Sequence, residues 1–189
     1  TIQVQSTPGA GSTFTFTIAL PRGSQPSAER FQTAGRLAGL RVLVVDDNPS
    51  SGRMLCRMLQ EWKMEPTMLP GAAPALEALA QADREGRRYA LTLVDAHMPP
   101  MSGFELVVQL QEAHLSSAGA LVVMLAPDRQ REDAMRCRAL GVPAYLSKPV
   151  GPAELFAALM AALGDPLPAR TRPESRHAPR APLRPLKVL

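Results

Sequence analysis

The sequence predicts a doubly wound α/β domain between residues 40 and 164 of the 189-residue chain. Short apolar runs alternate there with longer segments of helical periodicity, and five such strand–helix pairs follow one another. Turn and cap residues separate the segments: Gly141 and Gly164 lie where helices end, and Asp128 is placed to cap the helix that follows it. This alternation is typical of a parallel sheet that carries helices on both faces.

The expected elements have ordinary lengths. Strands are expected at 41–46, 65–69, 89–95, 120–125 and 143–147. Helices are expected at 49–62, 72–85, 103–114, 128–140 and 152–163. Hydrophobic residues make up 46% of the chain and aromatic residues only 4%, so the core between these elements must be aliphatic. In the flavodoxin-like strand order 2-1-3-4-5, the first, third and fifth strands end close to the point where the order reverses.

Those three strand ends carry the polar residues that point to a function. Asp46 and Asp47 end the first strand, Asp95 ends the third, and Lys148 follows the fifth. Converging carboxylates repel one another, and a hard divalent cation such as Mg²⁺, which prefers oxygen ligands, removes this repulsion. A metal ion and an ammonium together supply the charge neutralisation that phosphoryl transfer needs. The pattern predicts a magnesium-dependent phosphoryl-transfer site.

The motifs around these residues resemble those of response-regulator receiver domains. They read VLVVDDN at 42–48, LTLVDAHMPPMSGFEL at 91–106 and YLSKP at 145–149. The resemblance covers about residues 40–164. It implies that Asp95 accepts a phosphoryl group from the phosphohistidine of a kinase or a phosphotransfer domain. It also implies that Asp47 binds Mg²⁺ directly and that Asp46 acts mostly through water.

The same resemblance assigns further roles. The backbone carbonyl of His97 would be another metal ligand, and Lys148 would bind a phosphoryl oxygen, with a cis peptide bond before Pro149. The family usually has Ser or Thr at the end of the fourth strand, where this chain has Ala126. Tyr145 stands where the family has its rotating switch aromatic. Because the hydroxyl is missing, we expect Asp95 to be phosphorylated but the conformational response to be weakened or altered.

Residues 1–20 alternate apolar and polar side chains around the sequence PGAGS, which predicts a β-hairpin. Two strands alone are barely stable in water, so the hairpin needs partner strands. The segment resembles the closing hairpin of the ATP-binding domain of sensor histidine kinases, and residues 11–13 match its GST turn. The other ATP-site motifs of that family and its phosphoacceptor histidine helix are not found in this sequence. We therefore expect no productive ATP binding by this chain alone, and leave open whether it acts as an enzyme.

The remaining segments are expected to be linkers. Residues 21–39 mix Pro, Gly, Ser and charges, with a partly helical stretch at 28–37. Residues 165–189 form a Pro/Arg-rich tail that is expected to be disordered. The tail has six basic and two acidic residues, so it accounts for the whole net charge of +4, and we expect a solvated linker rather than a nucleic-acid arm. Its last residues, LKVL, echo LRVL at 40–43, and either begin a second receiver or are an end without meaning.

Together these features predict the receiver portion of a hybrid sensor histidine kinase, located in the cytoplasm, and leave open whether the parent kinase is anchored in the inner membrane. No apolar run approaches the roughly 20 residues of a membrane helix, so this segment is not expected to contact a membrane. Two cysteines without CxxC spacing are expected to be reduced packing thiols.

Three alternatives remain. One is a receiver-like interaction module that is never phosphorylated, which Ala126 favours. A transcriptional regulator would need an output domain after residue 164, where only the tail stands. A nucleotide enzyme would need a phosphate loop after the first strand, where the sequence reads DDNPSS.

Overall fold

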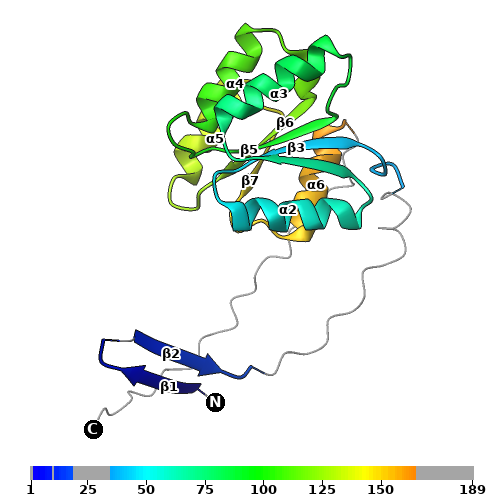
Figure 1. The fold of residues 1–189 in the computed structure, drawn as a ribbon. Coiled ribbons are helices and arrows are strands. Elements are labelled where there is room, and N and C mark those ends of the chain that lie inside the picture. The colour runs from blue at the N-terminus through cyan, green and yellow to red at the C-terminus, as the bar shows by residue number, and fades with distance from the viewer. Residues whose placement is uncertain (1, 10, 19–34, 165–189) are drawn as a thin grey trace, which may run out of the picture. The chain divides into compact units, whose positions relative to one another are not determined.

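The computed structural model describes residues 2–9, 11–18 and 35–164. The chain divides into two units between Arg36 and Leu37. The first unit contains a hairpin and the second contains an α/β domain (Figure 1). Most of the expected linker, including the start of its helical stretch, lies outside the described residues, as does the whole Pro/Arg-rich tail with its expected second-receiver strand.

The α/β unit is built on five parallel strands. They are β3 (Arg41–Val45), β4 (Glu65–Leu69), β5 (Leu91–Asp95), β6 (Ala120–Leu125) and β7 (Ala144–Ser147). Their order in the sheet is β4-β3-β5-β6-β7, which confirms the predicted order 2-1-3-4-5. Because β3 and β5 are neighbours, and Val45 pairs with Val94, the acidic residues that follow these positions meet at one edge of the sheet.

Five α-helices cover the two faces of this sheet (Figure 1). They are α2 (Pro49–Glu61), α3 (Ala72–Arg84), α4 (Gly103–Glu112), α5 (Gln130–Ala139) and α6 (Pro152–Ala162). Helices α2 and α6 pack on one face, and α3, α4 and α5 pack on the other. All predicted strand and helix limits lie within two residues of the observed ones, but the short 3₁₀ helix at Ser116–Ala118 was not predicted.

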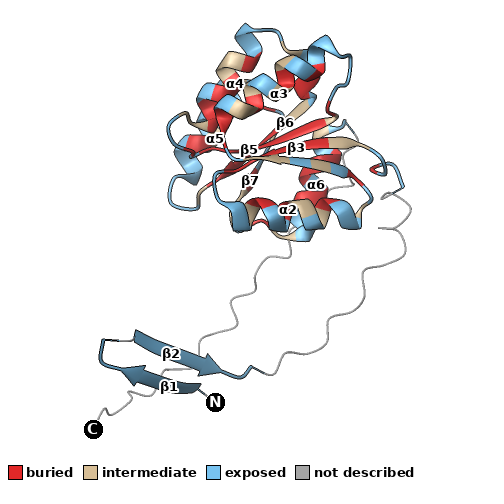
Figure 2. Cartoon of the chain, viewed as in Figure 1, coloured by how far each residue is buried: buried red, intermediate tan, exposed pale blue. Residues whose placement is uncertain are grey.

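The core is aliphatic, as the composition requires, and the central strands are its most buried part (Figure 2). Phe104 is the one aromatic ring among the largest fully buried side chains of the described residues. Leu37, which the sequence places in the linker, is fully buried with the residues under α2 and α6, so packing begins three residues before the predicted start of the domain. Met54, on α2, is 44% exposed.

The starts of α4 and α5 differ. Ser102 caps α4 through a reciprocal capping box with Glu105: the Ser102 hydroxyl accepts from the Glu105 N–H, and the Glu105 carboxylate accepts from the Ser102 N–H. The N-cap of α5 is Arg129, and no side chain bonds to the exposed N–H groups. The expectation that Asp128 caps α5 is therefore wrong, because the helix begins one residue further along the chain than a cap at Asp128 would require.

The first unit is the predicted hairpin, with strands β1 (Ile2–Thr7) and β2 (Gly11–Phe16). The strands are antiparallel, and the register places Ile2 opposite Phe16 and Val4 opposite Phe14. Because side chains alternate along a strand, these four lie on one face of the hairpin. Each of them is at least 55% exposed, so the described residues of the hairpin leave this apolar face uncovered.

Candidate functional site

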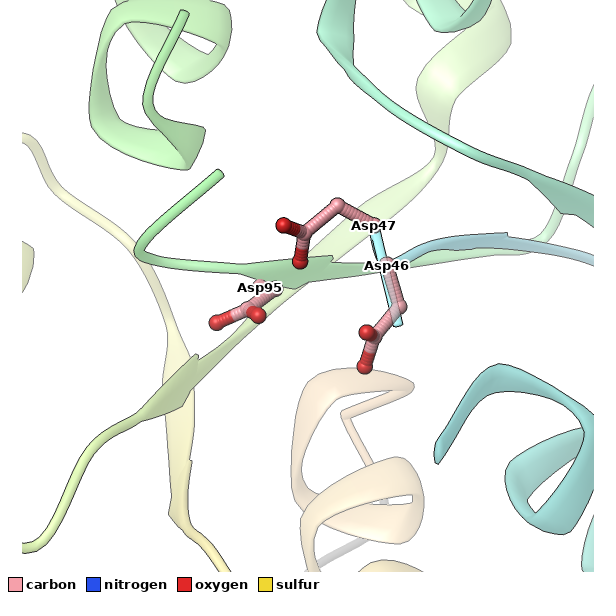
Figure 3. Close-up of side chains that lie close together, drawn as sticks. All are labelled: Asp46, Asp47 and Asp95. Atoms are coloured by element: carbon pink, nitrogen blue, oxygen red, sulfur yellow. The ribbon is translucent and has the colours of Figure 1, made fainter. Parts of the chain in front are cut away.

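Three carboxylates meet at the carboxyl edge of the central strands. Asp46 and Asp47 directly follow β3, and Asp95 is the last residue of β5. One carboxylate oxygen from each residue lies within 4.8 Å of the other two. Figure 3 shows that the side chains of the adjacent Asp46 and Asp47 leave the backbone in different directions. The convergence of the three residues, predicted from the strand order, is present in the structure.

Asp46 is fully buried, and its oxygens are already engaged by the protein. Its Oδ1 accepts a hydrogen bond from the backbone N–H of Asn48 at 2.9 Å, and its Oδ2 accepts one from the hydroxyl of Ser51 at 2.8 Å. Asn48 also caps α2 with its side chain. The sequence analysis did not single out Asn48 or Ser51. The signal that marks Asn48 is its position just before Pro49, where an N-cap is expected.

Lys148 joins the two buried carboxylates. Its Nζ lies 2.7 Å from Oδ2 of Asp95 and 3.3 Å from Oδ2 of Asp46. Burial lowers the pKa of Lys148, but the hydrogen bond and charge of Asp95, followed by those of Asp46, outweigh this effect and raise the pKa above its ordinary value. The side chain therefore stays charged and offsets the two anions. The peptide bond between Lys148 and Pro149 is cis.

Asp47 differs from its neighbour because its side chain is exposed. Within the described part of the chain, no hydrogen bond or ion pair engages its carboxylate. On the other side of the site, the backbone N–H of His97 donates to Oδ1 of Asp95 at 3.2 Å, which holds the peptide of His97 beside that carboxylate. The open oxygens of the site are thus those of Asp47, at the surface of the cluster.

The donor set fits a magnesium ion. Around an octahedral Mg²⁺ with bonds of about 2.1 Å, adjacent oxygens lie about 3.0 Å apart and opposite oxygens about 4.2 Å apart. The carboxylate oxygens here lie within 4.8 Å of one another, so they already converge on one place, and small side-chain movements or bridging waters would complete the coordination of an ion there. All the donors are oxygens, which Mg²⁺ prefers, and the exposed side of the cluster leaves room for the waters that this ion retains.

The two residues expected to affect the conformational response lie on neighbouring strands. Ala126 directly follows β6, is half-buried, and brings no polar side-chain atom to the site. Tyr145 lies in β7, and 38% of it is exposed. Strand β6 pairs with β5 on one side and with β7 on the other, with Val123 opposite Tyr145, so Ala126 follows the strand beside that of Asp95 and Tyr145 lies one strand further away.

Fold and site together define a doubly wound α/β domain with an acidic cation site and a lysine at its strand-order switch point. The family model of the response regulator receiver domain matches residues 42–160, and the chain belongs to that family. Receiver domains accept phosphoryl groups from histidine kinases.

Several known proteins are similar to this domain. The sensory/regulatory protein RpfC of Xanthomonas campestris is 33% identical over 122 residues, which are 64% of this chain and 16% of that protein. The hybrid signal transduction histidine kinase L of Dictyostelium discoideum is 31% identical over 129 residues, 67% of this chain and 7% of that protein. The chain thus spans less than a fifth of the length of either relative.

A solved structure adds information on the metal. It is the receiver domain of a sensor histidine kinase from Pseudomonas aeruginosa, with a magnesium ion coordinated in its active-site cleft. The two domains are 25% identical and superpose with a TM-score of 0.56, covering 67% of this chain and 99% of the other. In the part of our chain that the structure describes, no helix is long and apolar enough to cross a membrane.

Proposed function

We propose that this domain acts in a phosphorelay by accepting a phosphoryl group from a phosphohistidine onto Asp95. The observation that carries the proposal is that the three carboxylates differ in burial and in the contacts they make. Asp46 is buried and engaged by Ser51 and Lys148, whereas the oxygens of Asp47 are exposed and unengaged by the described residues. Asp95 lies between these two environments, with 9% of its side chain exposed, which suits a nucleophile that an incoming group must reach.

The proposed transfer is a simple exchange of bonds. A carboxylate oxygen of Asp95 forms a P–O bond as the P–N bond of the phosphohistidine breaks, and the leaving imidazole takes up a proton. Lys148 begins paired with Asp95 and turns to an oxygen of the arriving phosphoryl group, so that its charge follows the negative charge. Asp46, fixed by Asn48 and Ser51, keeps the ammonium in the site during this change.

The metal has defined ligands in this proposal. Asp47, Asp95 and the backbone carbonyl of His97 would hold Mg²⁺ directly, and Asp46 would reach it mostly through water. Bound Mg²⁺ neutralises negative charge on the phosphoryl oxygens. The oxygen-only donor set and the distances among the carboxylates support this choice of ion.

The proposed response to phosphorylation is weak or altered. Ala126 has no hydroxyl to bond to the phosphoryl group, which removes a contact that contributes about 1.5–3 kcal/mol when one partner is charged. Tyr145 is partly exposed and lies on the strand beside Ala126, so its movement is not tied to the phosphoryl group through a hydroxyl at that position.

We propose a hybrid sensor kinase, a phosphotransferase, as the parent protein. In this organisation residues 1–20 close a kinase ATP-binding domain, 21–39 form a linker, 40–164 form the receiver, and 165–189 form a Pro/Arg-rich linker. The uncovered apolar face of the hairpin supports the first assignment, because such a face is stable only against other strands or helices. The similarity to a hybrid histidine kinase supports the placement of the receiver in such a parent protein, and two free cysteines agree with a cytoplasmic location.

One rival function has a specific observation in its favour. Ala126 marks the domain as a candidate interaction module that is never phosphorylated. The intact contacts among Asp46, Asp95 and Lys148 speak against this alternative, because a site without chemistry has no need to bury two carboxylates around one ammonium.

Mass spectrometry separates the two functions. The chain is incubated with phosphoramidate and Mg²⁺ and its intact mass is measured, in parallel with Asp95→Asn and with Asp128→Asn, an exposed acid that serves as the control. We expect a gain of about 80 Da, one phosphoryl group, in the wild type and the control only. Removal of Mg²⁺ with EDTA should abolish the gain. An unmodified wild type, or a gain that persists in Asp95→Asn, would overturn the proposal.

A further inference from the structure

The first turn of α5 contains a buried carboxylate that the proposed chemistry does not use. Asp133 is 3% exposed, and among the described residues no hydrogen bond reaches its Oδ2. A buried carboxylate oxygen without a partner is destabilising, and nearly all such groups in proteins are paired. Asp133 therefore needs a nearby donor.

The nearest basic group is the imidazole of His97. Its Nε2 lies 3.4 Å from Oδ2 of Asp133, slightly beyond a good hydrogen bond, and no other basic side chain of residues 35–164 forms an ion pair with this carboxylate. The imidazole packs edge-on against Phe104, with ring centroids 6.5 Å apart, and the guanidinium of Arg136 covers that same ring at 4.3 Å. Helix α5 thus meets the loop after β5 through the contact between Asp133 and His97, and meets α4 through the guanidinium of Arg136 over Phe104.

His97 belongs to the phosphorylation site through its backbone. Its N–H donates to Asp95, and its carbonyl is the proposed metal ligand. Its side chain belongs to the interface with α5. The imidazole ring and the carbonyl oxygen of His97 are each two bonds from the same Cα. The position of the imidazole therefore restricts the orientation of the peptide. At Ala126, the usual place for a link between the site and the neighbouring strand, there is no polar side chain.

We infer that Asp133 is a positioning residue of the site: it holds the imidazole of His97, and thereby the metal-facing peptide, and the pair closes to hydrogen-bond distance when the site binds Mg²⁺. This inference rests on the proposed magnesium-dependent function. It makes α5 the element that senses occupancy of the site, through a contact that does not need a hydroxyl at position 126. Either a neutral or a protonated imidazole can donate from Nε2, so the link does not depend on the charge of His97.

Coupling between two sites is reciprocal. If Mg²⁺ tightens the pair, loss of the pair must weaken Mg²⁺ binding. Outer-shell partners of metal ligands typically contribute 10- to 100-fold in affinity. Because Asp133 acts on a backbone ligand rather than on a ligating side chain, we expect the lower end, about tenfold.

The test is a double-mutant cycle on Mg²⁺ affinity. Calorimetric titration with Mg²⁺ alone compares the wild type with Asp133→Ala, His97→Ala, the double variant, and Glu132→Ala, an exposed acid on the same helix that serves as the control. We expect each single variant to bind about tenfold more weakly, the double variant to be no weaker than the singles, and the control to match the wild type. Wild-type affinity in Asp133→Ala, or losses that multiply in the double variant, would overturn the inference.

A second readout measures the protection of α5 rather than the affinity for Mg²⁺. Amide hydrogen exchange over residues 130–139 should slow when Mg²⁺ is added to the wild type and should be insensitive to Mg²⁺ in Asp133→Ala. The His97 side chain is 36% exposed, so His97→Ala is the less disruptive change. It replaces Asp133→Ala in this experiment if Asp133→Ala fails to fold. A wild type that binds no Mg²⁺ would overturn the proposed function together with the inference, whereas normal Mg²⁺ binding that Asp133→Ala leaves unchanged would overturn the inference alone.

Discussion

The connections that follow β5 and β6 differ in how firmly hydrogen bonds fix them. After β5, Ser102 and Glu105 cap α4 reciprocally, and the N–H of Gly103 donates to the carbonyl of Ala96 at 3.0 Å. After β6, Ala126 brings no polar atom, and α5 begins without a side-chain cap. The connection that follows Asp95 is thus rich in directed bonds, whereas within the connection after β6 the N–H of Arg129 donates to the carbonyl of Ala126 at 3.3 Å and no side chain caps the helix. Under the proposed function, phosphoryl acceptance and the conformational response would depend on these two separate segments.

Loss of Lys148 should have the largest effect, a slower phosphorylation of Asp95. In Lys148→Met the ammonium that bridges Asp46 and Asp95 is removed while the stem of the side chain is retained. We expect phosphorylation of Asp95 to slow by roughly 10²- to 10³-fold, as when a charge-stabilising donor is removed from an active site. The rate of mass gain with phosphoramidate measures this. Lys63→Met, an exposed lysine at the far end of α2, is the matched control, and equal rates in the two variants would contradict the role of Lys148.

A hydroxyl at position 126 should give the connection after β6 a polar contact, as the connection after β5 already has. In Ala126→Ser the new hydroxyl can bond to the phosphoryl group, a contact of about 1.5–3 kcal/mol, so the equilibrium toward the switched form should shift by about tenfold or more. Beryllofluoride with Mg²⁺ mimics the phosphorylated state, and hydrogen exchange across β7 and Tyr145 reports the switch. Ala139→Ser, an exposed position on α5, is the control. Comparable exchange changes in the wild type and Ala126→Ser would show that the hydroxyl is irrelevant.

A methyl group added at Gly103 tests how closely the connection after β5 is packed. A Cβ on Gly103 would lie 2.1 Å from the backbone oxygen of Asp95 and 2.7 Å from a methyl carbon of Val94. Backbone cannot yield as a flexible side chain can, so Gly103→Ala should destabilise the domain by about 1–3 kcal/mol. Urea unfolding followed by the fluorescence of Trp62, the only tryptophan, measures the change. Gly71→Ala, where nothing lies within 4 Å and the backbone is extended, should change stability far less.

The regular part of the fold was readable from the sequence because its signals are local. Alternating apolar runs located each strand and helix to within two residues. The carboxylates were predicted because each directly follows or ends a buried strand, and parallel strands bring such ends together. Residues near the site, such as Ser51, were missed, since a hydroxyl in the first turn of a helix looks like any other.

Contacts between distant segments were not readable. His97 and Asp133 lie far apart in the sequence, and the burial of Asp133 depends on how α5 packs against α4 and β6. Leu37 looked like linker because a single leucine in a polar stretch gives no periodic signal. The cap of α5 was misplaced for a related reason: Asp128 has the right chemistry, but the path of the chain after Ala126 decides which residue precedes the first helical turn.

The two helix starts offer the smallest and cleanest comparison. Ser102→Ala removes a cap hydroxyl and should destabilise the domain by about 1 kcal/mol, whereas Asp128→Ala removes an acid that caps nothing and should change stability by less than about 0.5 kcal/mol. Hydrogen bonds from the side chain and backbone of Ser102 hold the pKa of Glu105 below its ordinary value of 4.5. A carboxyl group whose pKa is lower in the folded chain than in the unfolded chain stabilises the fold at pH values above its unfolded-state pKa. This stabilisation is lost as the pH falls through the folded-state pKa. The difference between Ser102→Ala and the wild type, measured by urea unfolding, should therefore be full at pH 7 and should shrink below about pH 4.5. Equal losses in Ser102→Ala and Asp128→Ala would mean that the start of α4 is no better fixed than the start of α5.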